Sequence, residues 1–150
     1  MKDTIARFEL VLATAPRKLV DISEADASRK PDPKRWSKKE VLGHLIDSAA
    51  NNHQRFVRAQ LVPRIDLPTY EQEFWVERQG YATEPWPDLV NLWLLLNRHL
   101  LHVVRAMPEN VLGHEISIAG RPPVPLLTVI ADYLGHMDNH LSQIFSSPAK

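Results

Sequence analysis

The sequence predicts an all-α protein, a four-helix bundle with a long connection between its second and third helices. Four segments carry apolar residues spaced by three or four positions, which is the stripe of an amphipathic helix. No segment shows the sustained apolar-polar alternation of a half-buried strand. With 150 residues the chain has the length of one ordinary domain, so we expect residues 1–150 to share a single core.

The first helix is predicted over residues 2 to about 24. Pro16 lies inside it and lacks a backbone N–H, so we expect it to kink or split the helix near Thr14. The following stretch, ASRKPDPKRW, combines two prolines with mixed charge and is typical of a loop.

The second helix has the clearest start in the chain. Ser37 and Glu40 form the S-x-x-E pattern of a capping box, and Trp36 before the cap can act as a hydrophobic staple. We therefore expect this helix to begin at Lys38 and to end before Pro63.

The connection over residues 61–86 is too irregular for one helix, and we expect a short helix within TYEQEFWVERQ. Pro87 should occupy the first position of the third helix, and Pro108 should stop that helix. Residues 109–125 follow, where ISI can be extended, and the last helix should fill about 126–145.

Composition excludes several classes of function. Eighteen basic residues balance eighteen acidic ones without a basic run, so we expect no nucleic-acid partner. No apolar stretch approaches the ~20 residues that cross a bilayer, and the N-terminus lacks a signal-peptide core, so we expect a soluble cytoplasmic protein without a membrane partner. Cysteine is absent, which leaves histidine, carboxylate or water as metal ligands.

The stretch DYLGHMDNHLSQI places His136 and His140 four residues apart, so they stand one above the other on a helix. On a helical wheel both flank the apolar stripe, and His44 occupies the matching flank of the second helix. If the two flanks meet, three imidazoles can bind one divalent ion and leave positions open for water or substrate. Alternatively, these are boundary histidines satisfied by hydrogen bonds.

Three segments, WSKKEVLGHLID, YEQEFWVERQGY and DYLGHMDNHLSQI, resemble the DinB-like superfamily of four-helix bundles. The resemblance implies a divalent metal bound by one histidine of the second helix and two of the last, which are His44, His136 and His140 here. Relatives include metal-dependent hydrolases and transferases that use a low-molecular-weight thiol such as bacillithiol or mycothiol. Relatives are often dimeric, so a homodimer is one expectation.

Further candidates lie beside these histidines. Asp132 precedes His136 by one turn and could accept its ring N–H, although a solvated helix residue is an equal alternative. Ser48, Asn51 and Arg55 share the flank of His44. The Arg55 cation could hold an anionic substrate group or form an ordinary surface salt bridge.

The remaining polar candidates are weaker. His99 and His102 are expected at the surface, with no partner on the second helix, and His53 falls on the far side of its stripe. Asp47 lies about 60° further from the core than His44 and is a weak candidate for orienting a ligand. No catalytic residue can be assigned.

The leading hypothesis is a metal-dependent enzyme that activates a low-molecular-weight thiol or water and acts on a small molecule. Three neutral imidazoles leave a zinc or nickel ion doubly charged, which lowers the pKa of a bound thiol or water. The alternative is a non-catalytic, metal-stapled bundle that serves as a stress-related binding or interaction protein.

Overall fold

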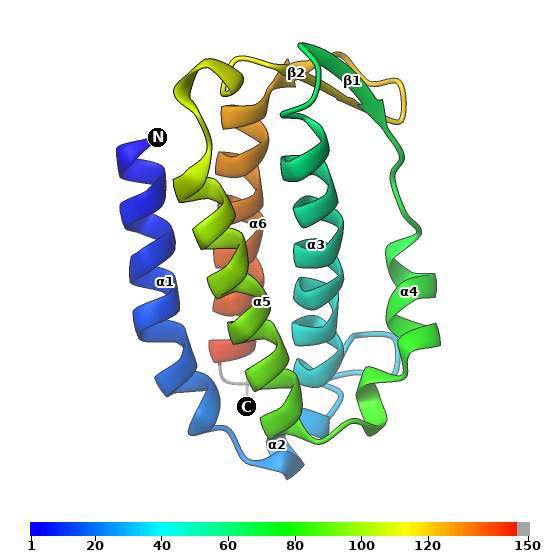
Figure 1. Ribbon diagram of the computed structural model, residues 1–150. Helices are drawn as coiled ribbons and strands as arrows, with labels where there is room; N and C mark the ends of the chain where they lie inside the picture. Colours follow the sequence, from blue (N-terminus) through cyan, green and yellow to red (C-terminus); the bar gives the residue numbers. More distant parts are fainter. Residues whose placement is uncertain (147–150) are drawn as a thin grey trace.

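The computed structural model describes residues 1–146, and four long helices form a bundle, as predicted (Figure 1). They are α1 (Lys2–Val20), α3 (Lys38–Arg58), α5 (Trp86–Ala106) and α6 (Leu126–Phe145). Helix α3 packs against both α5 and α6, and α1 packs against the same two helices. No helix in the described part of the chain is long and apolar enough to cross a membrane.

The core lies between these four helices and contains several fully buried aromatic side chains. The ring of Tyr133 makes edge-on contacts with Phe8 of α1 and Phe56 of α3, at centroid distances of 6.1 and 5.8 Å. The Tyr133 hydroxyl donates to Oδ1 of Asn97 on α5, so its polar end is satisfied inside the core. Each large side chain buried in this way contributes roughly 1.5–3 kcal/mol.

Helix α1 differs from its prediction. It runs unbroken through Pro16 and ends at Val20, so the split expected near Thr14 does not occur. Proline removes one hydrogen bond near the end of this helix, while Ala15 and Leu19 on either side are buried against the bundle and keep the last turns in place.

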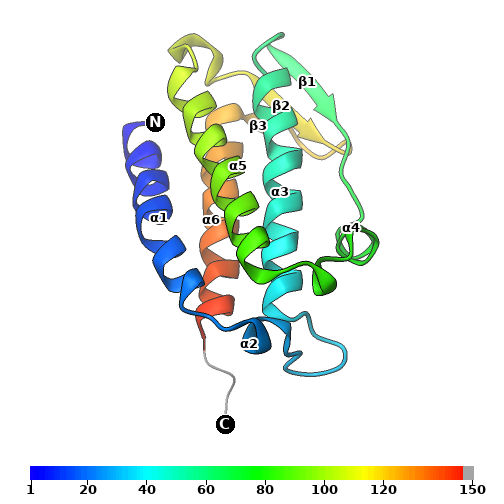
Figure 2. The same ribbon diagram turned by 60° about the horizontal axis from the view of Figure 1, so that its bottom comes forward.

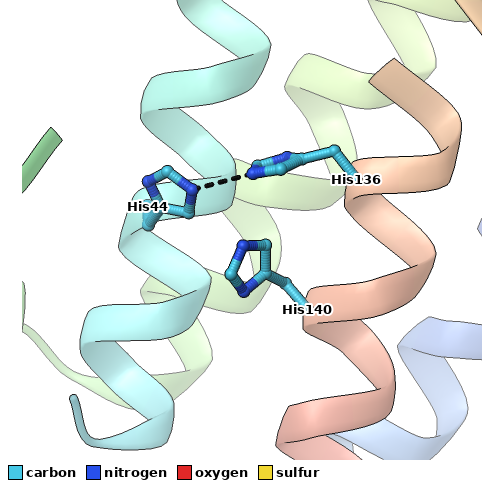
Figure 3. A group of neighbouring side chains, drawn as sticks. All are labelled: His44, His136 and His140. Atoms are coloured by element: carbon cyan, nitrogen blue, oxygen red, sulfur yellow. Dashed lines mark hydrogen bonds between the residues drawn. The ribbon is translucent and has the colours of Figure 1, made fainter. Parts of the chain in front are cut away.

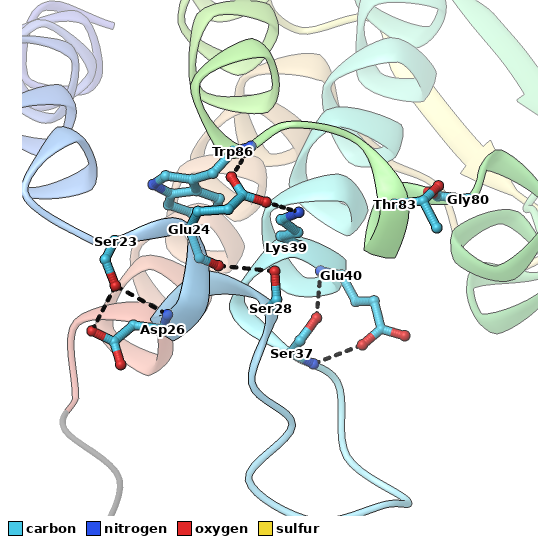
Figure 4. Close-up of polar contacts among 10 residues, drawn as sticks. All are labelled: Ser23, Glu24, Asp26, Ser28, Ser37, Lys39, Glu40, Gly80, Thr83 and Trp86. Atoms are coloured by element: carbon cyan, nitrogen blue, oxygen red, sulfur yellow. Dashed lines mark hydrogen bonds and ion pairs between the residues drawn. The ribbon is translucent and has the colours of Figure 1, made fainter.

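A five-residue helix, α2 (Glu24–Ser28), lies partly in the stretch that we expected to be a loop. It joins the starts of α3 and α5 (Figure 4). The Glu24 carboxylate pairs with Lys39 of α3 and accepts the backbone N–H of Trp86 of α5 at 2.8 Å. The indole N–H of Trp86 donates to the Leu19 carbonyl at 2.9 Å. Lys39 is only 3% exposed, so this ion pair neutralises a charge that would otherwise be buried alone.

The helix starts were predicted to within one residue. Helix α3 begins at Lys38 behind the expected capping box: Ser37 Oγ accepts the Glu40 N–H at 3.3 Å, and Glu40 Oε2 accepts the Ser37 N–H at 2.7 Å. Helix α5 begins at Trp86, so Pro87 is its second residue and not the first.

The two segments without a long helix, residues 61–86 and 109–125, pair with each other through short strands at one end of the bundle (Figures 1 and 2). Strand β1 (Arg64–Leu67) lies parallel to β2 (Glu115–Ile118), which pairs antiparallel with β3 (Val124–Pro125). Strand β2 contains the predicted extended ISI, whereas β1 was not predicted.

The rest of the long connection contains α4 (Gln72–Gln79), the expected short helix, and the 3₁₀ turn η1 (Tyr81–Thr83). Helix α4 is capped by Gly80, whose φ of +69° is readily adopted only by glycine. Both elements pack on α3, so the connection covers the outer side of that helix. A second 3₁₀ turn, η2 (Glu109–Val111), follows α5.

Candidate metal centre

Three histidines from α3 and α6 converge between these helices (Figure 3). The ring centroid of His44 lies 4.9 Å from the centroids of both His136 and His140, and the latter two are 4.5 Å apart. One ring nitrogen of each lies within 4.8 Å of the others, and Nε2 of His44 is 3.0 Å from Nε2 of His136. The two predicted flanks therefore do meet.

The separation of the two nearest nitrogens, on His44 and His136, fits a metal ion. Two nitrogens bound to one tetrahedral zinc at about 2.0–2.1 Å lie about 3.3 Å apart, close to the separation of the nearest pair here. The Nδ1 of His140 lies 3.1 Å from Gln143 Oε1. A donor at Nδ1 leaves the lone pair on Nε2, so Gln143 selects the tautomer that can bind a metal through Nε2.

Burial keeps two of the rings neutral. His44 is 1% exposed, and burial followed by the nearby His136 and His140 lowers its pKa to about 4. The pKa of His136 is also lowered to about 4, first by burial and then by His140. Neutral imidazole is the form that binds metal ions. Near pH 7 His44 and His136 therefore present lone pairs without first losing a proton.

An aromatic side chain closes one side of the cluster. The Trp36 ring, which precedes the cap of α3, lies 5.2 Å from the His44 ring at an interplanar angle of 39°. On α6 the neighbouring Met137 and Leu141 are buried in the core, which fixes the rotation of the helix and turns both histidines toward α3. The cluster thus lies at the edge of the core and not on the open surface.

A buried carboxylate, which the sequence suggested only weakly, lies one turn beyond His44. Asp47 is 1% exposed, and its Oδ1 accepts the Tyr81 hydroxyl at 2.7 Å and the side-chain amide of Gln79. Burial raises the pKa of Asp47 to about 6. Its Oδ2 is buried without a hydrogen-bond partner among residues 1–146. Asp47 therefore attaches the connection to α3 next to the histidines.

Gly43 allows this attachment. A Cβ at this position would lie 2.1 Å from Cδ2 of Tyr81, so only glycine lets the Tyr81 ring approach the α3 backbone. Sequence reasoning missed this contact, although a glycine in the interior of an otherwise strong helix is a signal that could have indicated it.

The other predicted residues on α3 form a polar strip. Ser48 and Asn52 are buried, and the Asn52 amide donates to the Ser48 carbonyl at 2.8 Å. The Asn51 amide donates to the Asp47 carbonyl at 2.9 Å. Arg55 is half-buried and donates from Nη1 to Asn52 Oδ1 at 3.4 Å. The strip continues along α3 from the histidine cluster.

Of the two alternatives for Asp132, the structure has the solvated helix residue: Asp132 is exposed and does not accept the ring N–H of His136, whose buried Nδ1 has no partner among residues 1–146. His99 and His102 are exposed, as expected. The expectation that His99 has no partner on the second helix was wrong, because its ring lies 5.2 Å from that of His53 on α3; on α5 it lies 6.3 Å from that of His102. The wheel could not show this contact, since it depends on how α3 and α5 are placed side by side.

Comparison with known proteins gives one family, and the fold is similar to several solved structures. The model of the DinB superfamily matches residues 7–144. No curated protein sequence matches the chain significantly. The fold is similar to YfiT from Bacillus subtilis, described as a probable metal-dependent hydrolase with an unusual four-helix bundle topology, at a TM-score of 0.82 and 18% identity over 95% of this chain and 82% of that one.

The second relative is the mycothiol-dependent maleylpyruvate isomerase. Its TM-score is 0.76 at 14% identity, over 95% of this chain and 60% of the isomerase. A mutant of the same isomerase gives a TM-score of 0.79 at 14% identity, over 97% of this chain and 61% of that one. At these identities the two relatives establish the fold alone.

Proposed function

The chain belongs to the DinB superfamily, and we propose that it is a metal-dependent enzyme in which His44, His136 and His140 bind one divalent ion. The observation that carries this proposal is the convergence of three ring nitrogens within 4.8 Å of one another. Zinc and nickel suit such a set of imidazoles best. When bound, the ion would supply positive charge that lowers the pKa of a coordinated thiol or water.

The nucleophile that we propose is a low-molecular-weight thiol or a water molecule, and the substrate is a small electrophile. One structural relative is described as a probable metal-dependent hydrolase and the other as a mycothiol-dependent isomerase, which supports both kinds of nucleophile. A chain without cysteine offers no thiolate of its own to compete with a thiol co-substrate.

The protein's own side chains orient the ligands and limit access of water. Gln143 fixes the tautomer of His140, and the Trp36 ring covers one side of His44. Ser48 and Asn51 lie further along α3, where their polar groups can contact a substrate that extends from the histidine cluster. We propose these two residues for substrate positioning and assign no acid or base.

The alternative is a non-catalytic bundle whose metal staples α3 to α6 and whose connection binds a partner. A structural zinc site closes its shell with four protein ligands. Among residues 1–146, no fourth histidine or carboxylate joins the three histidines, which favours a site with open coordination positions.

Elemental analysis of protein purified without a metal-affinity column tests the first step. We expect about one divalent ion per chain, lost on chelation and restored by zinc or nickel. The loaded protein is then screened with thiols plus a small electrophile, and with activated esters and amides. A cobalt-substituted sample whose spectrum shows four protein ligands, together with no metal-dependent turnover, would refute the enzyme and support the non-catalytic, metal-stapled bundle.

A further inference from the structure

Arg55 is a half-buried cation without an acidic partner among the residues that the structure describes. Among residues 1–146 its guanidinium takes part in no ion pair, whereas the paired arginines are all exposed: Arg7, Arg29, Arg64 and Arg105. Its hydrogen bond to Asn52 Oδ1 is long, at 3.4 Å. A guanidinium has five N–H donors, and a partly buried charge is normally paired. Most donors of Arg55 are therefore left for a group from outside the chain.

The position of Arg55 connects it with the histidine cluster. It follows His44 by about three turns of α3, so both side chains leave the same face of the helix. Along the helix axis the two residues are about 16 Å apart. The polar strip with Ser48 and Asn52 lies between them, and a reactant of moderate size could contact both ends.

A planar guanidinium with donors to spare is a suitable partner for a carboxylate, because it can donate two parallel N–H bonds to the two carboxylate oxygens. The side chains of the strip beside it are neutral, so Arg55 is the positive end of this face of α3.

We propose that Arg55 forms a subsite for a carboxylate group of one reactant, either the electrophile or the thiol. The inference rests on the proposed function only for the identity of that reactant, because binding of a carboxylate at Arg55 needs no metal. The subsite makes the enzyme selective for anionic reactants that extend along α3 from the histidine cluster.

Succinate is the probe, titrated calorimetrically into the metal-free protein at constant ionic strength. Arg55→Gln should weaken succinate binding about tenfold or more, because a charge-assisted hydrogen-bonded contact is lost. Arg58→Gln is the matched control, since it removes the same charge from an exposed position on the same helix and should leave binding unchanged. Arg55→Lys should retain part of the binding, because it keeps the charge and loses the planar fork of donors.

Equal weakening by Arg55→Gln and Arg58→Gln would mean non-specific charge attraction and overturn the subsite. Unchanged binding in Arg55→Gln would overturn it as well. Circular dichroism and the unfolding midpoint of each variant show whether it is folded, and Arg55→Lys provides the test if Arg55→Gln does not fold.

Turnover distinguishes the two reactants. Cysteine is compared with its methyl ester as the thiol, and a carboxylated electrophile with its amide. Arg55→Gln should raise KM only for the carboxylated form of the reactant that occupies the subsite. Arg55-dependent succinate binding without any metal-dependent turnover would refute the proposed function and leave the subsite standing. Turnover with KM values unaffected by Arg55→Gln would refute the subsite alone.

Discussion

Gly43→Ala should destabilise the protein, although alanine is the better helix former. In the interior of a helix this exchange normally gains about 1 kcal/mol. Here the added methyl would lie 2.1 Å from Cδ2 and 2.3 Å from Cγ of Tyr81, where non-bonded carbons need about 3.5–4.0 Å. The ring, which is 3% exposed, must therefore retreat by more than 1 Å.

The size of the loss follows from what the ring gives up. Overpacking of a buried site costs about 1–3 kcal/mol. The retreat also breaks the 2.7 Å hydrogen bond from the Tyr81 hydroxyl to Asp47, and a bond to a charged group is worth about 1.5–3 kcal/mol. After subtracting the helix-propensity gain, we expect a net loss of about 2–4 kcal/mol in the free energy of unfolding.

Urea unfolding followed by circular dichroism measures this loss, and in a thermal melt the Tm should fall by about 6–12 °C. Gly135→Ala in α6 is the matched control, because a Cβ there meets nothing within 4 Å and should stabilise by up to about 1 kcal/mol. In a Tyr81→Ala background, Gly43→Ala should become neutral or stabilising. A Gly43→Ala protein as stable as the wild type would refute the proposed contact between Tyr81 and α3.

Three further predictions concern the metal centre, the α3 cap and the buried carboxyl. Alanine at any one of the three clustered histidines should lower both the bound metal measured by elemental analysis and the melting temperature of the loaded protein; His53→Ala should change neither, and equal metal content in all variants would contradict the ligand assignment. Ser37→Ala should cost about 1 kcal/mol of unfolding free energy in urea, with metal affinity unchanged. The pKa of Asp47 is raised to about 6 from 3.8, so its stabilising contribution is complete below pH 3.8 and is lost as the pH rises through 6. The free energy of unfolding of Asp47→Asn should therefore rise relative to that of the wild type by on the order of 2 kcal/mol between pH 4 and pH 7.5. A difference between the two proteins that stays constant across that range would contradict the raised pKa.

The candidate site could be predicted in part from the sequence because a helix places residues at known angles. His136 and His140 fall on one flank of α6 whatever the rest of the protein does, and His44 falls on a flank of α3. Their convergence required only that the two flanks face each other. The hydrogen bond between Tyr81 and Asp47 could not be predicted from the sequence, because it joins residues 34 positions apart through an irregular connection.

The sequence by itself determined the long helices and most of their ends. The capping box at Ser37, the prolines near the ends of α5 and the apolar spacing of α6 act within a few residues, so they have the same meaning in any fold. These local signals also indicated the short helix in the connection.

Where local signals were weak or were opposed, only the tertiary structure determined the conformation. Helix α1 continues through Pro16 because packing of its neighbours outweighs one lost hydrogen bond. Strand β1 has four residues, too few for a periodic pattern, and exists because β2 pairs with it from far along the chain. Asp47 is buried because the connection folds back over α3. Each of these outcomes depends on contacts between distant segments, whose free energy appears only when the whole bundle has formed.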